Sequence, residues 1–282
     1  MKEKKEFILK CILTGLVYAI LTCIVQVPIG NVLLLIFGGE PDPMISSDRI
    51  PFLLFSLFIV GVIMAFFYYL YGYLFTATSK WKQGMKFGLF VLSSNYIPQV
   101  CFLDATKGIE ALITGGFSVI QVEFLDLLIL IGTSLIMVRY MPYRNHEEKA
   151  NNKTSWWKCF VCGVVYAVCL FLLHEIMLPL LGFGSMASGL DVSNENMFFF
   201  YSVMLAGFVL TGVLVSYYAQ KIENVRKRGS FIIAFGGLIW CAFTITMIPL
   251  GFGVLPTTLF SIISFIAFIA VTIVDNLLNN RG

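Results

Sequence analysis

Long apolar stretches alternate with short polar connections along the whole chain. A membrane-spanning helix needs about 20 mostly apolar residues. Eight stretches meet this requirement, at 8–29, 52–76, 85–103, 120–140, 156–180, 198–219, 230–250 and 256–276. No charged residue interrupts the centre of any of them. The pattern therefore predicts an all-α integral membrane protein with eight transmembrane helices.

Composition supports a lipid environment for these helices. Hydrophobic residues make up 59% of the 282 residues and charged residues only 12%, whereas soluble domains carry about 25% charged residues. A water-soluble fold could not cover this much apolar surface, so the lipid bilayer is the first expected partner. The net charge of +3 is small, and we expect no nucleic-acid partner.

The positions of the cationic residues predict the orientation in the membrane. Of the 19 lysines and arginines, 17 fall at the N-terminus, in the connections after the second, fourth and sixth stretches, at the C-terminus, or within three residues of the stretch ends that adjoin these segments. Only Arg49 and Lys107 lie in the other connections. The positive-inside rule then places both termini in the cytoplasm. We expect the protein in the plasma membrane, with the polar segment 143–155 on the cytoplasmic side.

An internal repeat divides the sequence. The segment Lys10–Ala19 (KCILTGLVYA) returns 148 residues later as Lys158–Ala167 (KCFVCGVVYA). The predicted domains are a first four-helix repeat at 1–142, a linker at 143–155 and a second four-helix repeat at 156–282. Because four spans return the chain to the same side, the repeats are expected to be related by an axis along the membrane normal.

Weaker matches extend the repeat into later helices. They pair Ser56 and Gly61 with Ser202 and Gly207 at an offset of 146, and Lys82 and Gly84 with Lys227 and Gly229 at an offset of 145. Glycines at such positions allow close helix packing in membranes.

Proline recurs near the predicted outer end of every helix that runs outward, at Pro28, Pro98, Pro179 and Pro249. Proline removes a backbone donor and loosens the helix. Two interpretations stay open: ordinary helix termination at the membrane interface, or an outer vestibule lined by opened helix ends.

Polar residues inside the predicted helices gather in the same outer half. The candidate substrate-binding residues are Asp126, Glu175, His174, Asn95, Gln99 and Gln26. A carboxylate in hydrocarbon is costly unless it faces protein or water, so Asp126 and Glu175 are the leading candidates. The structural alternatives are a solvated helix start for Asp126, the outer interface for Glu175 and a packing role for His174.

The seven cysteines lie in or beside apolar stretches. Cys159 and Cys162 have the Cys-x-x-Cys spacing of metal and redox sites. The sequence has no second pair, and His146 lies on the polar linker. Helix packing is therefore the favoured interpretation, and no metal or other cofactor is predicted.

Two functions from different classes follow. The first is a small transporter or permease with an acidic, polar site in the outer half between the repeats, suited to a cation, a proton or an amine-bearing molecule. The alternative is a scaffold or accessory subunit that binds other membrane proteins through its helix faces. The chain lacks the Gly-x-Ser-x-Gly, His-Glu-x-x-His and Walker motifs, so an intramembrane enzyme is not expected.

Overall fold

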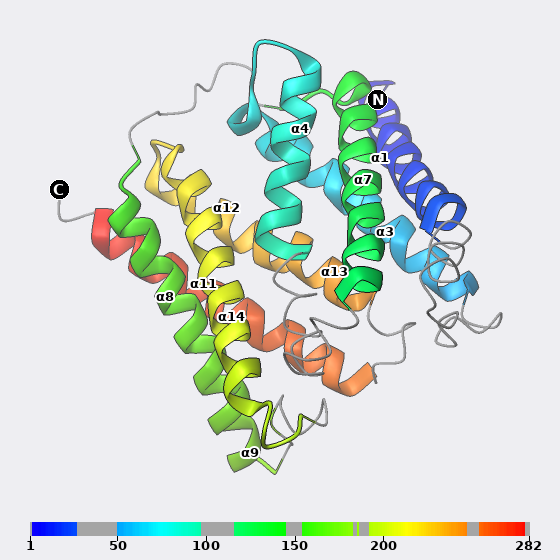
Figure 1. Cartoon of the computed structure of the whole chain (residues 1–282). Coiled ribbons are helices and arrows are strands. Elements are labelled where there is room, and N and C mark those ends of the chain that lie inside the picture. The colour runs from blue at the N-terminus through cyan, green and yellow to red at the C-terminus, as the bar shows by residue number, and fades with distance from the viewer. Residues whose placement is uncertain are drawn as a thin grey trace. The chain divides into compact units, whose positions relative to one another are not determined.

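The computed structural model describes residues 2–26, 50–96, 116–144, 154–182, 185, 192–246 and 254–279, and the described part contains helices and no strand (Figure 1). Each of the eight predicted stretches contains a helix. The elements are α1 (Lys2–Leu21), η1 (Thr22–Gln26), α3 (Ile50–Tyr71), η2 (Gly72–Phe75), α4 (Lys80–Val91), η3 (Leu92–Tyr96), α7 (Gly116–Tyr140), α8 (Trp156–Phe171), η4 (Leu172–Met177), α9 (Leu178–Leu180), α11 (Met197–Gln220), α12 (Val225–Ala234), η5 (Phe235–Trp240), α13 (Cys241–Ile245) and α14 (Val254–Asn279).

Five continuous helical stretches are long and apolar enough to cross a membrane. They cover Pro51–Phe75, Trp156–Leu180, Met197–Gln220, Val225–Ile245 and Thr257–Asn279. A shorter apolar helix covers Leu127–Tyr140. The prediction of an all-helical integral membrane protein is confirmed at this level.

The chain forms two compact units. The first comprises Met1–Leu92, Gly115–Glu148 and Ala242–Val254, and the second comprises Ser93–Thr114, Lys149–Cys241 and Leu255–Gly282. Each unit therefore takes most of one half of the sequence and a short segment from the other half. The domain boundaries at 142 and 156 stay a prediction.

In the first unit, α1 and α3 cross at a glycine pair. A Cβ atom on Gly15 would lie 2.7 Å from the carbonyl oxygen of Phe58, and one on Gly61 would lie 2.8 Å from the Cα atom of Gly15. Both distances are shorter than a side chain tolerates, so only glycine allows the two backbones to come this close. The predicted packing role of Gly61 is confirmed.

In the second unit, α8 and α11 make a crossing of the same kind, and the two helices lie side by side in Figure 1. A Cβ atom on Gly163 would lie 2.6 Å from the carbonyl oxygen of Val209, and one on Gly212 would lie 2.7 Å from the Cα atom of Gly163. The pairing of Gly61 with Gly207 is thus wrong, because the glycine of α11 that contacts α8 is Gly212.

The helices α4 and α7 also belong to the first unit, apart from the last residues of the η3 segment that follows α4. Cβ atoms on Gly84 and Gly88 would meet the Cα atoms of Leu135 and Ile131 on α7 at 2.9 and 3.2 Å. Also on α4, the buried amide of Gln83 donates a hydrogen bond to the hydroxyl of Tyr68 at 2.7 Å.

Aromatic side chains fill the centre of the second unit. Tyr166 of α8 is completely buried, and its ring contacts Phe208, Trp240 and Phe268 at centroid distances of 6.1, 5.9 and 4.4 Å. Phe208, Trp240 and Phe268 come from α11, η5 and α14, so this cluster joins the four helical stretches of the unit.

Two helices that follow basic connections begin with side-chain caps. Ser79 accepts a hydrogen bond from the amide of Lys82 at the start of α4. Asn224 accepts hydrogen bonds from the amides of Arg226 and Lys227 at the start of α12. Such caps satisfy amides that have no partner within the helix.

Candidate functional site at the π-helical segments

Four short π-helical segments interrupt the helical stretches of the described chain. They are η1, η3, η4 and η5, and each lies inside a stretch that was predicted to run outward. The π-helix is rare, and it occurs mostly as a single wide turn, frequently at functional sites. These segments are therefore the first place to look for a site.

The backbone of η4 and η5 shows the widened hydrogen bonding directly. The amide of Leu178 donates to the carbonyl of Leu173, and the amide of Cys241 donates to the carbonyl of Gly236, five residues back in both cases. Pro179 lies in α9, two residues after the end of η4, and supplies no amide hydrogen. The chain thus leaves α-helical geometry just before the proline that was singled out from the sequence.

Glu175 lies on η4 and is partly buried. The hydroxyl of Tyr201, on α11, donates a hydrogen bond of 2.7 Å to Oε2 of Glu175. The Tyr201 ring is held in turn by Phe171, at a centroid distance of 5.5 Å. The carboxylate is therefore fixed between two helices instead of extending freely from one.

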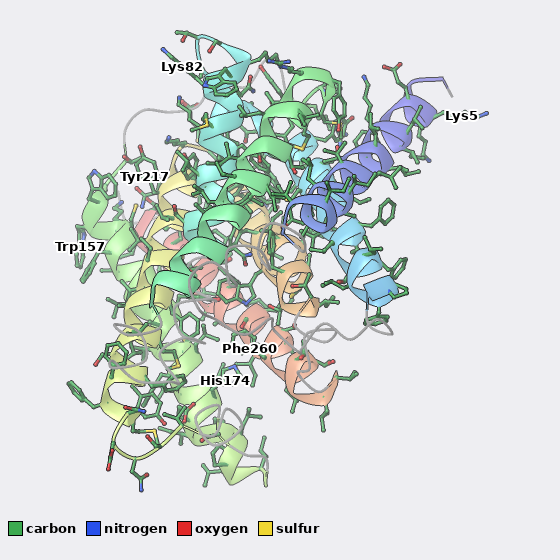
Figure 2. All side chains as sticks on the ribbon, turned by 45° about the vertical axis from the view of Figure 1, so that its right-hand side comes forward. Lys5, Lys82, Trp157, His174, Tyr217 and Phe260 are labelled. Atoms are coloured by element: carbon green, nitrogen blue, oxygen red, sulfur yellow. The ribbon has the colours of Figure 1, made fainter. Side chains whose placement is uncertain are left out.

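His174 precedes Glu175 and is 4% exposed. Its ring lies 5.0 Å from the ring of Phe260 on α14, and the two side chains approach each other in Figure 2. Within the described residues, Nε2 of His174 has no hydrogen-bond partner. The packing role foreseen for His174 is therefore present, and it leaves one buried ring nitrogen without a hydrogen-bond partner among the described residues.

The other candidate residues are described to different extents. Asn95 is completely buried on η3. Gln26 belongs to η1 and Asp126 to α7 by their backbone, but their side chains lie outside the described part, as does the whole of Gln99. The structure thus brings His174 and Glu175 together with Tyr201 and Phe260, and the rest of the predicted set stays a prediction.

Tyr201 and Phe260 were not anticipated as parts of the site. Both are aromatic residues in apolar helices, where such residues are ordinary, and no sequence signal marks them. Together the four residues offer a fixed carboxylate, a phenol and an imidazole beside an aromatic ring. Glu175 with Tyr201, and His174 with Phe260, form two separate contacts, and groups of these kinds bind cations by charge, by hydrogen bonding and by contact with a ring face.

The structure shows no group of three or more His, Cys, Asp or Glu side chains placed to hold a metal ion among the residues it describes. Comparison of the chain with family models, with curated proteins and with solved structures gave no match.

Proposed function

We propose that the chain is a small permease-like membrane transporter for a cationic or amine-bearing solute, which binds at the π-helical segments. The proposal rests mainly on one observation. Each of the four stretches that are predicted to run outward contains one π-helical segment, where the backbone leaves α-helical geometry. Loosened helix turns expose backbone groups that suit ions and polar solutes in membrane proteins. Glu175, His174, Tyr201 and Phe260 supply the side chains that select a cation.

We further propose eight spans arranged as two repeats of four. The glycine contacts support this idea when Gly61 is paired with Gly212 instead of Gly207. Gly15 and Gly163 differ by 148 positions, and their partners Gly61 and Gly212 differ by 151. The capping residues Ser79 and Asn224 differ by 145, as do Gly84 and Gly229.

Both termini and the linker are proposed to lie in the cytoplasm of a cell whose plasma membrane holds the protein. The distribution of the 17 cationic residues supports this orientation. An impermeant maleimide applied to intact cells is expected to label Ser193→Cys and not Asn152→Cys, while both react after the membrane is permeabilised. The exposed position of Ser193 makes it a suitable reporter. Labelling of Asn152→Cys alone in intact cells would contradict the proposed orientation.

Transport is tested in vesicles reconstituted with the full chain. Protons, followed with an enclosed pH-sensitive dye, and radiolabelled methylammonium are the two probes. We expect the wild-type protein to carry at least one of them. Glu175→Gln and Asp126→Asn are expected to abolish the flux, because each removes the negative charge that attracts the cation. Tyr201→Phe removes one hydrogen bond to Glu175 and is expected to weaken solute affinity by about fivefold.

Ser202→Ala is the matched control for the substitutions on η4 and α11. Ser202 is exposed beside Tyr201, and its hydroxyl donates only to the carbonyl of Phe198 in its own helix. Its flux should equal that of the wild type. If the wild-type protein carries neither probe, or if Glu175→Gln leaves the flux unchanged, the alternative of a scaffold that binds other membrane proteins is favoured.

A further inference from the structure

A second acidic residue, Asp275, is buried in the last part of α14. Its side chain is completely inaccessible, as are those of Ser216, Cys159 and Cys162. Neither carboxylate oxygen of Asp275 has a hydrogen-bond partner within the described residues. The sequence analysis did not select Asp275, because it falls at the very end of an apolar stretch. A buried carboxylate without partners is costly and requires an explanation.

The cationic side chains near Asp275 are committed to other groups. Lys158 of α8 donates to the carbonyl of Leu278 at 2.9 Å and to Oδ1 of Asn279 at 3.0 Å. Arg228 of α12 donates through Nε to the carbonyl of Ile222. Both cations act on Asp275 through space, but the described part of the chain contains no ion pair to its carboxylate within 4.0 Å.

The remaining neighbours of the carboxyl group carry no charge at neutral pH in their ordinary form. Ser216, on α11, lies beside Asp275 and beside the thiols of Cys159 and Cys162. The Ser216 hydroxyl also has no hydrogen-bond partner of good geometry within the described residues. Asn279, one turn after Asp275, donates to the Asp275 backbone carbonyl. The carboxyl group is thus surrounded by a hydroxyl, two thiols and two cationic side chains that already donate hydrogen bonds to other groups.

The corresponding place in the first unit is arranged differently. With the offsets of the glycine crossings, Cys159, Cys162 and Ser216 correspond to Cys11, Thr14 and Ala65. There the hydroxyl of Thr14 forms a 2.8 Å hydrogen bond with the hydroxyl of Tyr140. Neutral groups satisfy each other in the first unit, whereas the second unit has a carboxyl group with no such partner.

A proton is the occupant that these observations favour. A metal cation would need several oxygen ligands, and the positive charges of Lys158 and Arg228 oppose a multiply charged ion more strongly than they oppose a single proton. A proton needs no additional space in a completely buried cluster. It also converts one carboxylate oxygen into a donor, so that the carboxylic acid can donate to the Ser216 hydroxyl. A single proton thereby removes a buried charge and provides partners for two groups that lack them.

We infer that Asp275, positioned against Ser216, is a proton-binding site of the second unit, separate from the site at η4. The proton is taken from solvent by the carboxylate and is held between Asp275 and Ser216. This inference depends only on contacts inside the second unit and not on the proposed transport function.

Infrared spectroscopy of the full-length protein tests the site. At pH 7 the wild type should show a carboxylic-acid C=O band that shifts in deuterated water. Asp275→Asn should lose this band and Asp275→Glu should move it, while Glu223→Gln, which changes an exposed carboxylate, should retain it. The inference would be overturned if the wild-type band persisted unchanged in both Asp275 variants, or if the wild type showed no such band.

Thermal unfolding gives a second measurement with a defined sign. A folded state that holds a proton released by the unfolded chain loses stability as pH rises. Because the ordinary pKa of the carboxyl group in the unfolded chain is ~4, the melting temperature of the wild type should fall more than that of Asp275→Asn as the pH rises from 5 to 8. An equal or steeper fall in Asp275→Asn would show that Asp275 is ionised in the folded protein.

Discussion

Replacing Trp240 with alanine is expected to lower the free energy of unfolding by about 3–5 kcal/mol, as for other large buried aromatic side chains. The Trp240 side chain is completely buried. Its ring contacts Tyr166, Phe208, Phe260 and Phe268 at centroid distances of 5.9, 6.1, 6.3 and 6.1 Å. The substitution leaves a cavity at the point where four helical stretches meet. Thermal and denaturant unfolding of the purified protein, followed by near-ultraviolet circular dichroism, measure the loss.

Phe198→Ala is the control for the loss of an aromatic side chain. Phe198 lies at the start of α11 and is 85% exposed. Its removal opens no cavity, and the expected change is within about 0.5 kcal/mol. Comparable losses in the two variants would contradict the central packing role of Trp240.

Gly163→Ala carries the second large expected effect. The added methyl group would meet the carbonyl oxygen of Val209 at 2.6 Å and the backbone nitrogen of Val213 at 3.1 Å. Backbone atoms cannot turn aside as a side chain can, so α8 and α11 must separate along their crossing. We expect destabilisation of about 1–3 kcal/mol, measured by thermal unfolding in the same detergent as the wild type.

Gly132→Ala provides a matched control with the opposite expected sign. Gly132 lies in the middle of α7, and a Cβ atom there would meet nothing within 4 Å. Alanine is preferred to glycine inside a helix by roughly 0.5–1 kcal/mol, so this variant should equal or exceed the wild type in stability. If Gly163→Ala behaves in the same way, α8 and α11 are not in the close contact described above.

The positions of the helices could be predicted from the sequence, because a continuous apolar stretch bounded by charges is a strong signal. The side of each helix that contacts its neighbour could not be predicted in this way. α11 is apolar around its whole circumference, so no stripe of hydrophobic residues indicates which side meets α8. Matching by residue identity chose Gly207 because Ser202 lies at a suitable distance before it. The three-dimensional contact instead selects Gly212.

The candidate site was predictable in part for a related reason. Glu175 and His174 stand out as ionisable residues within an apolar stretch. Tyr201 does not stand out, because tyrosine is common near the ends of membrane helices. Asp275 was hidden by its place at the end of a stretch, where a charge normally reaches water. The π-helical turns leave no mark in the sequence, because a stretch that is apolar on all sides has no polar face whose position a wide turn could shift.

The division of the chain between the two units has a consequence for biosynthesis. Ala242 and the residues after it belong to the first unit, where the ring of Phe243 lies 6.5 Å from that of Tyr18. Tyr18 is made early in translation and Phe243 near its end. The first unit therefore cannot reach its final packing when the ribosome has completed only the first half of the chain. The early helices of the first unit must therefore wait for the segment that begins at Ala242, and the second unit must wait for the segment that begins at Leu255.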